Sequence, residues 1–180
     1  MLDLQQNCRR MRRTQNSLQP LRKCYRKLGE FLMVWFLTGL LCVAIDQLSK
    51  VFVANNFMTG QSIPVINNVF HFTYQLNDGA AFSILGGKTV FLSIVSVVII
   101  LGILAYIFIK KPSNNLELLS LTLIIAGAVG NLIDRVFRGA VIDFLDFTLI
   151  NFPVFNIADC FVVIGGVLFF FYVLKYVDNK

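Results

Sequence analysis

Four long apolar runs constrain the fold of this chain more than any other feature. They lie at about residues 31–52, 90–109, 116–133 and 158–176. A helix needs about 20 predominantly apolar residues to cross the hydrocarbon core of a bilayer. The chain is also only 14% charged, whereas soluble domains carry about 25% charged residues. The sequence therefore predicts an all-α membrane protein whose four transmembrane helices form a single domain, residues 31–177.

Basic residues are concentrated in the first part of the chain. Residues 1–30 hold eight of the sixteen Lys and Arg. Four crossings place both ends on the same side as Lys110 and Lys111, so the positive-inside rule predicts cytoplasmic termini. Residues 1–30 and 178–180 are then cytoplasmic tails, and a basic flank of this kind favours membrane lipid over nucleic acid as its partner. A mobile tail and a short amphipathic surface helix around residues 18–25 both fit the first tail.

The segment 54–88, between the first two runs, is too polar to cross a membrane. Within it, residues 69–75 read VFHFTYQ, in which Phe70, Phe72 and Tyr74 alternate with polar neighbours. This alternation indicates a strand, and the Asn77-Asp78-Gly79 sequence that follows is typical of a turn. We expect a small extracytoplasmic β-sheet between helices 1 and 2, with His71 as an ordinary strand residue.

Acidic residues gather between the third and fourth runs. Four of the ten Asp and Glu lie there: Asp134, Asp143, Asp146 and Asp159. Carboxylates so close to a membrane are costly unless they are paired or functional. Asp143 follows the third helix and Asp159 begins the fourth, and the predicted topology places both at the outer surface. Their separation of sixteen positions allows the chain to fold back and bring the two carboxyls together.

Two carboxyls held close share one proton, because both cannot ionise cheaply. One can then accept a proton from water while the other polarises a carbonyl or protonates a leaving amine. The pair titrates as a unit, so the sequence does not assign the acid and the base. Asp143 and Asp159 are therefore the candidate catalytic residues of a hydrolase that needs no metal or other cofactor. A transporter lining or structural ion pairs remain as alternatives at this point.

Several polar residues are candidates for supporting this pair. Asp46 and Lys50 are four residues apart on the first helix and share a face. They form either an ion pair that packs the bundle or a polar face aimed at the site. Arg135 either pairs with its neighbour Asp134 at the end of the third helix or binds a substrate carbonyl or headgroup. Amide hydrogen bonds that orient substrate or backbone are expected from Asn77, Asn131 and Asn156, whereas Asp146 is expected to be solvated.

Other catalytic arrangements find little support. The four cysteines form no C-x-x-C pair and His71 is the only histidine, which argues against zinc sites and disulfide frameworks. A Ser-His-Asp triad would have to use His71, and no G-x-S-x-G motif accompanies it. A Ser-Lys dyad built on Ser49 and Lys50 is disfavoured because adjacent helical residues point apart.

Four segments in order resemble the motifs of bacterial lipoprotein signal peptidase, also named signal peptidase II. They read DQLSK at 46–50, NDGAAFS at 77–83, GNLIDRVFRGAVIDFLD at 130–146 and FNIAD at 155–159. The similarity covers about residues 31–176. Two departures are a serine at position 83, where the family commonly has glycine, and the longer basic extension at 1–30.

The resemblance implies an aspartyl endopeptidase of the bacterial inner membrane. Such an enzyme removes the signal peptide from prolipoproteins by cutting before a cysteine that carries diacylglycerol, and it is inhibited by the cyclic peptide globomycin. The family's catalytic aspartates fall on Asp143 and Asp159. Its other site residues fall on Asp46, Asn77, Asn131, Arg135 and Asn156, with Asp134 in a supporting role. A small ion-coupled transporter and a non-catalytic scaffold are the rival hypotheses.

Overall fold

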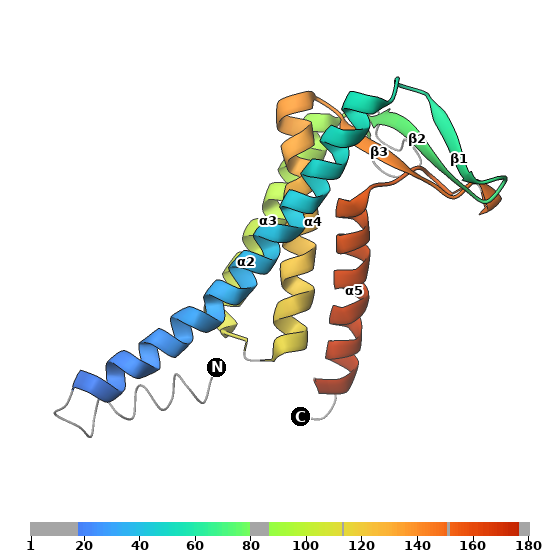
Figure 1. The fold of residues 1–180 in the computed structure, drawn as a ribbon. Coiled ribbons are helices and arrows are strands. Elements are labelled where there is room, and N and C mark those ends of the chain that lie inside the picture. Colours follow the sequence, from blue (N-terminus) through green and yellow to red (C-terminus); the bar gives the residue numbers. More distant parts are fainter. Residues whose placement is uncertain (1–17, 80–86, 113, 151, 177–180) are drawn as a thin grey trace.

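In the computed structural model the described residues form four α-helices, a short 3₁₀ helix at Thr148–Ile150 and a small sheet at one end of the bundle (Figure 1). The structure describes residues 18–79, 87–112, 114–150 and 152–176. Ser83, residues 1–17 and the tail at 178–180 lie outside these ranges, as do the side chains of residues 18–31. Predictions for them stay predictions.

The four helices are α2 (Leu18–Asn56), α3 (Thr89–Lys110), α4 (Asn115–Arg138) and α5 (Ile157–Tyr176). Within the described residues, four helical segments are long and apolar enough to cross a membrane: Leu32–Asn56, Thr89–Lys110, Asn115–Arg138 and Ile157–Lys175. The protein is therefore a multi-pass membrane protein. The first helix extends past the predicted limits at both ends, so residues 18–30 are helical and continuous with the first span.

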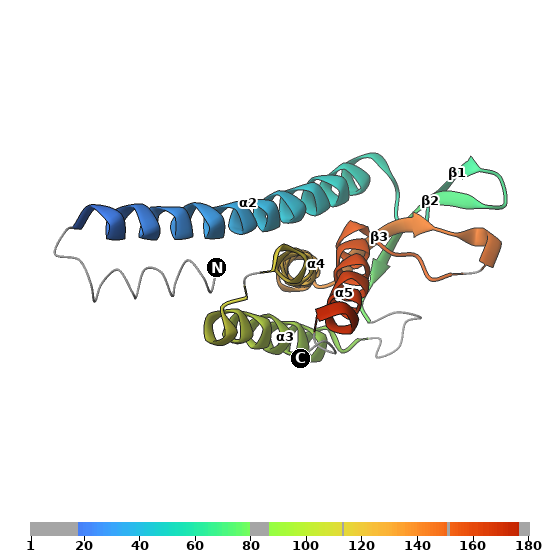
Figure 2. The same cartoon turned by 90° about the horizontal axis from the view of Figure 1, so that it is seen from below.

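Helix α4 occupies the centre of the bundle and packs against α2, α3 and α5 (Figure 2). Its packing against α5 requires small residues, because a Cβ atom at Gly127 would collide with the Ala158 carbonyl oxygen. A Cβ at Gly165 would lie 2.7 Å from the Ser120 carbonyl oxygen. Glycine thus allows the two helices to approach at both levels.

Local sequence sets the ends of α4. The Asn114 side chain accepts a 2.8 Å hydrogen bond from the Leu116 backbone N–H and so caps the first turn. Gly139 ends the helix in a left-handed conformation at φ 78°, which glycine adopts without steric cost. The helix ends five residues later than predicted, so Asp134, Arg135 and Arg138 lie in its last two turns and not in a loop.

The sheet has the strand order β1-β2-β3, with β1 at Ser62–Ile66, β2 at Phe70–Asn77 and β3 at Val141–Asp146. Both pairings are antiparallel. The first two strands confirm the predicted sheet, and His71 is a β2 residue as expected. The third strand was not predicted, and it brings Asp143 into register with Gln75 of β2.

A small core fastens the sheet to the bundle. Val53 of α2, Tyr74 of β2 and Ile142 and Phe144 of β3 form one buried cluster. The cluster fixes the strand that carries Asp143 against the end of the first helix. The sheet therefore extends to one side of the bundle while its β3 edge stays next to α5 (Figure 1).

Candidate active site

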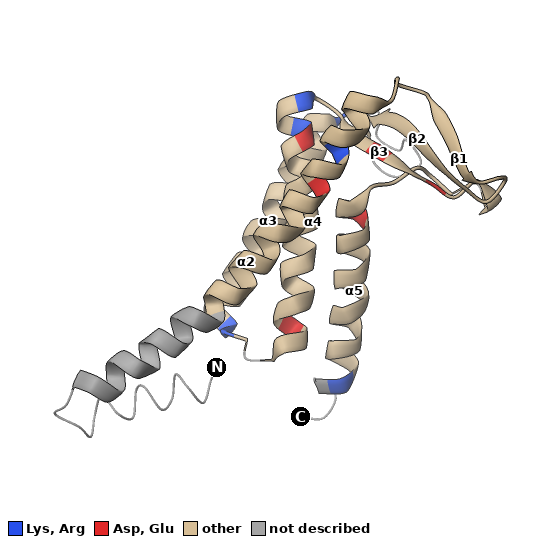
Figure 3. Cartoon of the chain, in the orientation of Figure 1, with Lys and Arg blue, Asp and Glu red and all other residues tan. Residues whose placement is uncertain are grey.

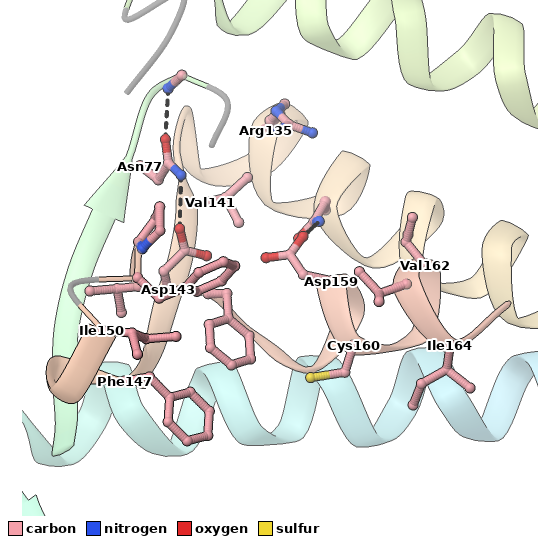
Figure 4. Close-up of a pocket in the computed structure, with 17 residues that line it drawn as sticks. Asn77, Arg135, Val141, Asp143, Phe147, Ile150, Asp159, Cys160, Val162 and Ile164 are labelled. Carbon is pink, nitrogen blue, oxygen red and sulfur yellow. Dashed lines mark hydrogen bonds between the residues drawn. The ribbon is translucent and has the colours of Figure 1, made fainter. Parts of the chain in front are cut away.

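Asp143 and Asp159 line the same cavity, which has a volume of about 630 Å³. Asp143 is the third residue of β3, and Asp159 lies in the first turn of α5. Figure 4 shows their carboxyl groups pointing toward one another across the cavity. The structure therefore brings together the two residues that the sequence analysis selected as a catalytic pair.

Asp143 is almost fully buried, with 2% of its surface exposed. Its Oδ2 accepts a 2.8 Å hydrogen bond from Asn77 Nδ2, and its Oδ1 accepts a 2.6 Å bond from Asn156 Nδ2. Burial raises the pKa of Asp143 to about 7, against the lowering effect of the Asn77 bond, and the charge of Asp159 adds to the increase. Asp143 can therefore hold or release a proton near neutral pH.

Asp159 is held by the beginning of its own helix. Its Oδ2 accepts a 3.2 Å hydrogen bond from the Asn156 backbone N–H, and its backbone N–H donates to Asn156 Oδ1 at 3.0 Å. This reciprocal pair is an Asn/Asp form of the capping box. The other carboxylate oxygen, Oδ1, accepts a 2.8 Å bond from Asn131 Nδ2 of α4. The local signal that starts α5 thus also orients the Asp159 carboxylate.

The three asparagines predicted as supporting residues all reach the acidic pair. Asn156 Nδ2 bonds Asn131 Oδ1 at 3.1 Å as well as Asp143. Asn77 accepts the Gly79 backbone N–H at 2.9 Å through Oδ1, which is an Asx turn that confirms the predicted turn. That bond fixes the amide so that its nitrogen faces Asp143.

Behind the cavity lies a buried cluster of charges between α2 and α4. Lys50 Nζ forms 2.9 Å ion pairs with Asp46 Oδ2 and Asp134 Oδ2, and all three side chains are fully buried. Arg138 Nη1 pairs with Asp134 Oδ1 from the more exposed side. Figure 3 shows that these charged residues gather in the parts of α2 and α4 nearest the sheet. The predicted Asp46–Lys50 ion pair is confirmed.

The predicted pairing of Asp134 with Arg135 is wrong. Asp134 pairs with Lys50 and Arg138, whereas Arg135 lines the cavity. Residues four apart on a helix share a face and adjacent residues do not, which explains why Arg138 takes the partner expected for Arg135. The cavity position favours the other interpretation, in which Arg135 faces a substrate.

Asp46 lies outside the lining of the cavity and supports it from behind. Its Oδ1 accepts a 2.9 Å hydrogen bond from the backbone N–H of Ala158, in the first turn of α5. A carboxylate at a helix N-terminus satisfies an otherwise unpaired N–H and complements the helix dipole. Asp46 therefore fixes the helix that carries Asp159 to α2.

The sequence analysis missed two members of this surrounding network, Gln47 and Arg138. Gln47 Nε2 donates to Asp46, to Asp134 and to the Gly130 carbonyl oxygen at 3.0 to 3.2 Å. The spacing of Asp134 and Arg138, four residues apart, was the available signal for Arg138. Asp146 was expected to be solvated, but it accepts a 2.6 Å bond from Thr73 Oγ1.

The geometry argues against a Ser-Lys dyad. Ser49 Oγ donates to the Asp46 backbone carbonyl oxygen at 2.6 Å. Lys50 Nζ makes its contacts with Asp46, Asp134 and Asn131 and is fully buried. An ammonium group has three donors and no lone pair, and all three donors of Lys50 are directed at these acceptors. It therefore cannot accept a proton from Ser49.

Four apolar helices, together with a cavity in which two carboxyls face each other, define a multi-pass membrane protein with a candidate hydrolytic site. The family model for signal peptidase (SPase) II matches residues 38–175. The chain therefore belongs to the signal peptidase II family, as the resemblance of its motifs predicted.

Individual relatives agree with this assignment. The chain is 46% identical over 137 residues to the lipoprotein signal peptidase of Moorella thermoacetica, covering 76% of this chain and 89% of that protein. It is 44% identical over 143 residues to that of Clostridioides difficile, covering 79% and 95%. A solved bacterial membrane enzyme, 35% identical, superposes with a TM-score of 0.78 over 83% of this chain and 93% of that chain.

Proposed function

We propose that this protein is a membrane aspartyl endopeptidase that removes signal peptides from diacylglyceryl-modified prolipoproteins, cleaving before the lipid-modified cysteine. The observation that carries the proposal is the facing of Asp143 and Asp159 across one cavity. Family membership supports the peptidase activity, and the names of the relatives support a lipoprotein substrate.

The chemistry follows from the two carboxyls. A water molecule between Asp143 and Asp159 gives a proton to the ionised carboxylate and attacks the scissile carbonyl carbon. The protonated carboxyl donates a hydrogen bond to the carbonyl oxygen and supplies the proton that the leaving amine needs. The elevated pKa of Asp143, about 7, keeps one proton available to the pair near neutral pH.

Arg135 is suited to hold the peptide near this pair. It lies on the lining of the cavity together with Asn77 and Gly79, and Figure 4 places it at the same end as the two carboxyls. A guanidinium group presents several N–H donors in one plane. Arg135 would therefore bind substrate carbonyl oxygens or a lipid headgroup, with Asn77 as a second donor.

The rest of the cavity lining is largely apolar and suits a lipid-modified substrate. It includes Phe147, Ile150, Phe152, Val163 and Ile164. Val163 and Ile164 are 63% and 49% exposed on the spanning helix α5, so the cavity is continuous with a surface that faces membrane lipid. A diacylglyceryl substrate could reach the carboxyls sideways from the bilayer without crossing water.

The proposal includes an orientation in the bacterial inner membrane. The sheet, whose strands carry Asn77 and Asp143 of the cavity lining, lies at one end of the bundle, and the short α3–α4 connection lies at the other end (Figure 1). Lys110 and Lys111 are at that connection, which the positive-inside rule places in the cytoplasm. The termini are then cytoplasmic and the active site is extracytoplasmic, where globomycin-type inhibitors would bind.

The test is cleavage of a diacylglyceryl-modified precursor by the purified protein in detergent, followed by the mass of the released peptide. We expect cleavage before the modified cysteine, none of the unmodified precursor, and inhibition by globomycin. Asp143→Asn and Asp159→Asn should each reduce kcat by at least about 1,000-fold. Asp146→Asn is the matched control because Asp146, on the same strand, contacts Thr73 and lies outside the cavity lining.

Three results would contradict the proposal. Full activity in either catalytic variant would exclude the acidic pair. Equal cleavage of modified and unmodified precursors would exclude the lipid requirement. Proton-coupled flux across vesicles without any cleaved product would favour the ion-coupled transporter instead.

A further inference from the structure

We propose that Lys50 is a positioning residue for the acidic pair, because its ammonium group holds the Asn131 amide in the one orientation that donates to Asp159. The inference rests on the proposed function of Asp143 and Asp159. It assigns the buried charge cluster behind the cavity a part in the reaction in addition to its part in helix packing.

The three hydrogen-bond donors of Lys50 match the three acceptors around it. Nζ lies 2.9 Å from Asp46 Oδ2, 2.9 Å from Asp134 Oδ2 and 3.0 Å from Asn131 Oδ1. The residue is fully buried. A lysine ammonium group has three donors and no acceptor, so its direction is fixed by these three contacts.

This contact decides how the Asn131 amide is turned. A side-chain amide has one acceptor atom and one donor atom at its tip. Lys50 can only donate, so Asn131 must present Oδ1 to it and Nδ2 to the opposite side. Nδ2 then lies 2.8 Å from Asp159 Oδ1. Asn156 Nδ2 supports the same orientation, since it also donates to Asn131 Oδ1 at 3.1 Å.

A fixed donor on Asp159 holds Oδ1 of that carboxylate in one position. Without Lys50 the Asn131 amide could turn over and present its oxygen to Asp159, and the carboxylate would lose this donor. Lys50 therefore orients the Asp159 carboxylate for its part in the reaction. The effect is transmitted through Asn131, which stands between the ammonium group and the carboxylate.

Other charged and titratable groups surround Asp159 and must be held constant in any test. They come from every element packed against it: Asp143 on β3, Asp134 and Arg135 on α4, Asp46 on α2 and Cys160 on α5 itself. Removing Lys50 alone would leave an unbalanced negative charge in this group. The test therefore uses variants that remove one carboxylate together with the ammonium group.

Two double variants separate positioning from packing, because each keeps the net charge of the wild-type cluster. Asp46→Asn with Lys50→Met removes the Lys50 contact to Asn131, and Asp46→Asn alone keeps that contact. Asp134→Asn, alone and with Lys50→Met, repeats the comparison through the other ion pair. Methionine is close to lysine in length and lacks the ammonium group, so packing is largely preserved. Folding of each purified full-length variant is checked by thermal unfolding and gel filtration.

The readout is kcat and KM on a diacylglyceryl-modified precursor. Each double variant should lose at least about tenfold in kcat relative to both the wild type, which has the same net charge, and its single parent, with KM unchanged within about twofold. Equal kcat in the double variants and their parents would overturn the inference. Unfolding of both double variants while both parents fold would also overturn it, because Lys50 would then act on the bundle alone.

The same experiment separates this inference from the proposed function. Activity in Asp143→Asn or Asp159→Asn would end both. Inactive Asp143 and Asp159 variants, combined with double variants whose kcat equals that of their single parents, would end only the role of Lys50.

Discussion

Asn156 donates a 2.6 Å hydrogen bond through Nδ2 to Asp143 Oδ1. The same residue caps the backbone of Asp159 through Oδ1. One side-chain amide thus orients both Asp143 on the strand and Asp159 on the helix. The amide cannot turn over, because the backbone N–H of Asp159 can only donate and therefore needs the amide oxygen. Asn156 is fully buried, so no solvent competes for these bonds.

Asn156→Ala is expected to lower both activity and stability. The variant loses the α5 cap and the bond to Asp143, and kcat should fall by about 100-fold because the carboxyls lose their fixed geometry. Thermal unfolding should show a loss of about 1–2 kcal/mol. Asn114→Ala is the control because it removes the cap of α4 at the other end of the bundle. It should cost similar stability with kcat unchanged, and an equal loss of kcat would refute the special role of Asn156.

The pH dependence of cleavage should have an alkaline limb near pH 7. Burial raises the pKa of Asp143 to about 7, and above that pH the pair loses the proton that its acid form supplies. We expect kcat/KM to fall about tenfold per pH unit above the limb. Asp146→Asn should show the same profile. A flat profile from pH 7 to pH 9 would mean that Asp143 is not the proton donor.

The same pKa makes a prediction about stability. The folded state binds the Asp143 proton more tightly than the unfolded state, whose pKa is near 4. The stabilisation is therefore present at low pH and is lost as the pH rises through 4 toward 7, by at most about 4 kcal/mol. The Tm of the wild-type protein should fall relative to that of Asp143→Asn between pH 5 and pH 8. A constant difference in Tm would contradict the elevated pKa.

Gly130→Ala tests the close approach of α2, α4 and α5. A Cβ atom at Gly130 would lie 2.5 Å from Asp46 Oδ2 and 3.2 Å from Ala158 Cβ. Asp46 cannot move without breaking its bonds to Lys50 and to the Ala158 N–H. We expect a loss of about 1–3 kcal/mol and of about tenfold or more in kcat. Gly166→Ala, where a Cβ meets nothing within 4 Å, should change neither, and equal effects in both variants would refute this packing argument.

The four helices, strand β2 and the presence of a small sheet could be predicted because their signals are local. Apolar runs of about 20 residues mark the spans, and the alternation at Phe70, Phe72 and Tyr74 marks β2. The third strand escaped prediction because VIDFLD is only six residues long and its apolar residues do not alternate regularly with polar ones. Its pairing with β2 is a contact between distant segments.

The candidate site was only partly accessible from sequence for a related reason. Asp143 and Asp159 stood out because carboxylates are rare beside membrane helices. The link from Lys50 through Asn131 to Asp159 joins three helices and has no signature in any one of them. Arg135 and Arg138 differ in which face of α4 they occupy, and this difference decides which of them pairs with Asp134. Because α4 was predicted to end at residue 133, neither arginine was assigned to a helix face.

A second polar cluster lies at the opposite end of α4 and should act on stability alone. Glu117, in the first turn of α4, is buried and accepts a 2.7 Å hydrogen bond from Tyr106 of α3. Tyr172 of α5 also bonds this carboxylate. The cluster therefore joins three helices at the end that lies far from the cavity.

Tyr106→Phe should lower the free energy of unfolding by about 1–2 kcal/mol, because it removes one donor from a buried carboxylate. Cleavage at a temperature well below Tm should keep its wild-type kcat and KM, since Asp143 and Asp159 are held by Asn77, Asn131 and Asn156. Ser96→Ala is the control because Ser96 on the same helix bonds only its own backbone at Leu92, and it should change neither stability nor activity. A fall in kcat for Tyr106→Phe without a fall in Tm would show that the two ends of the bundle are coupled, contrary to this expectation.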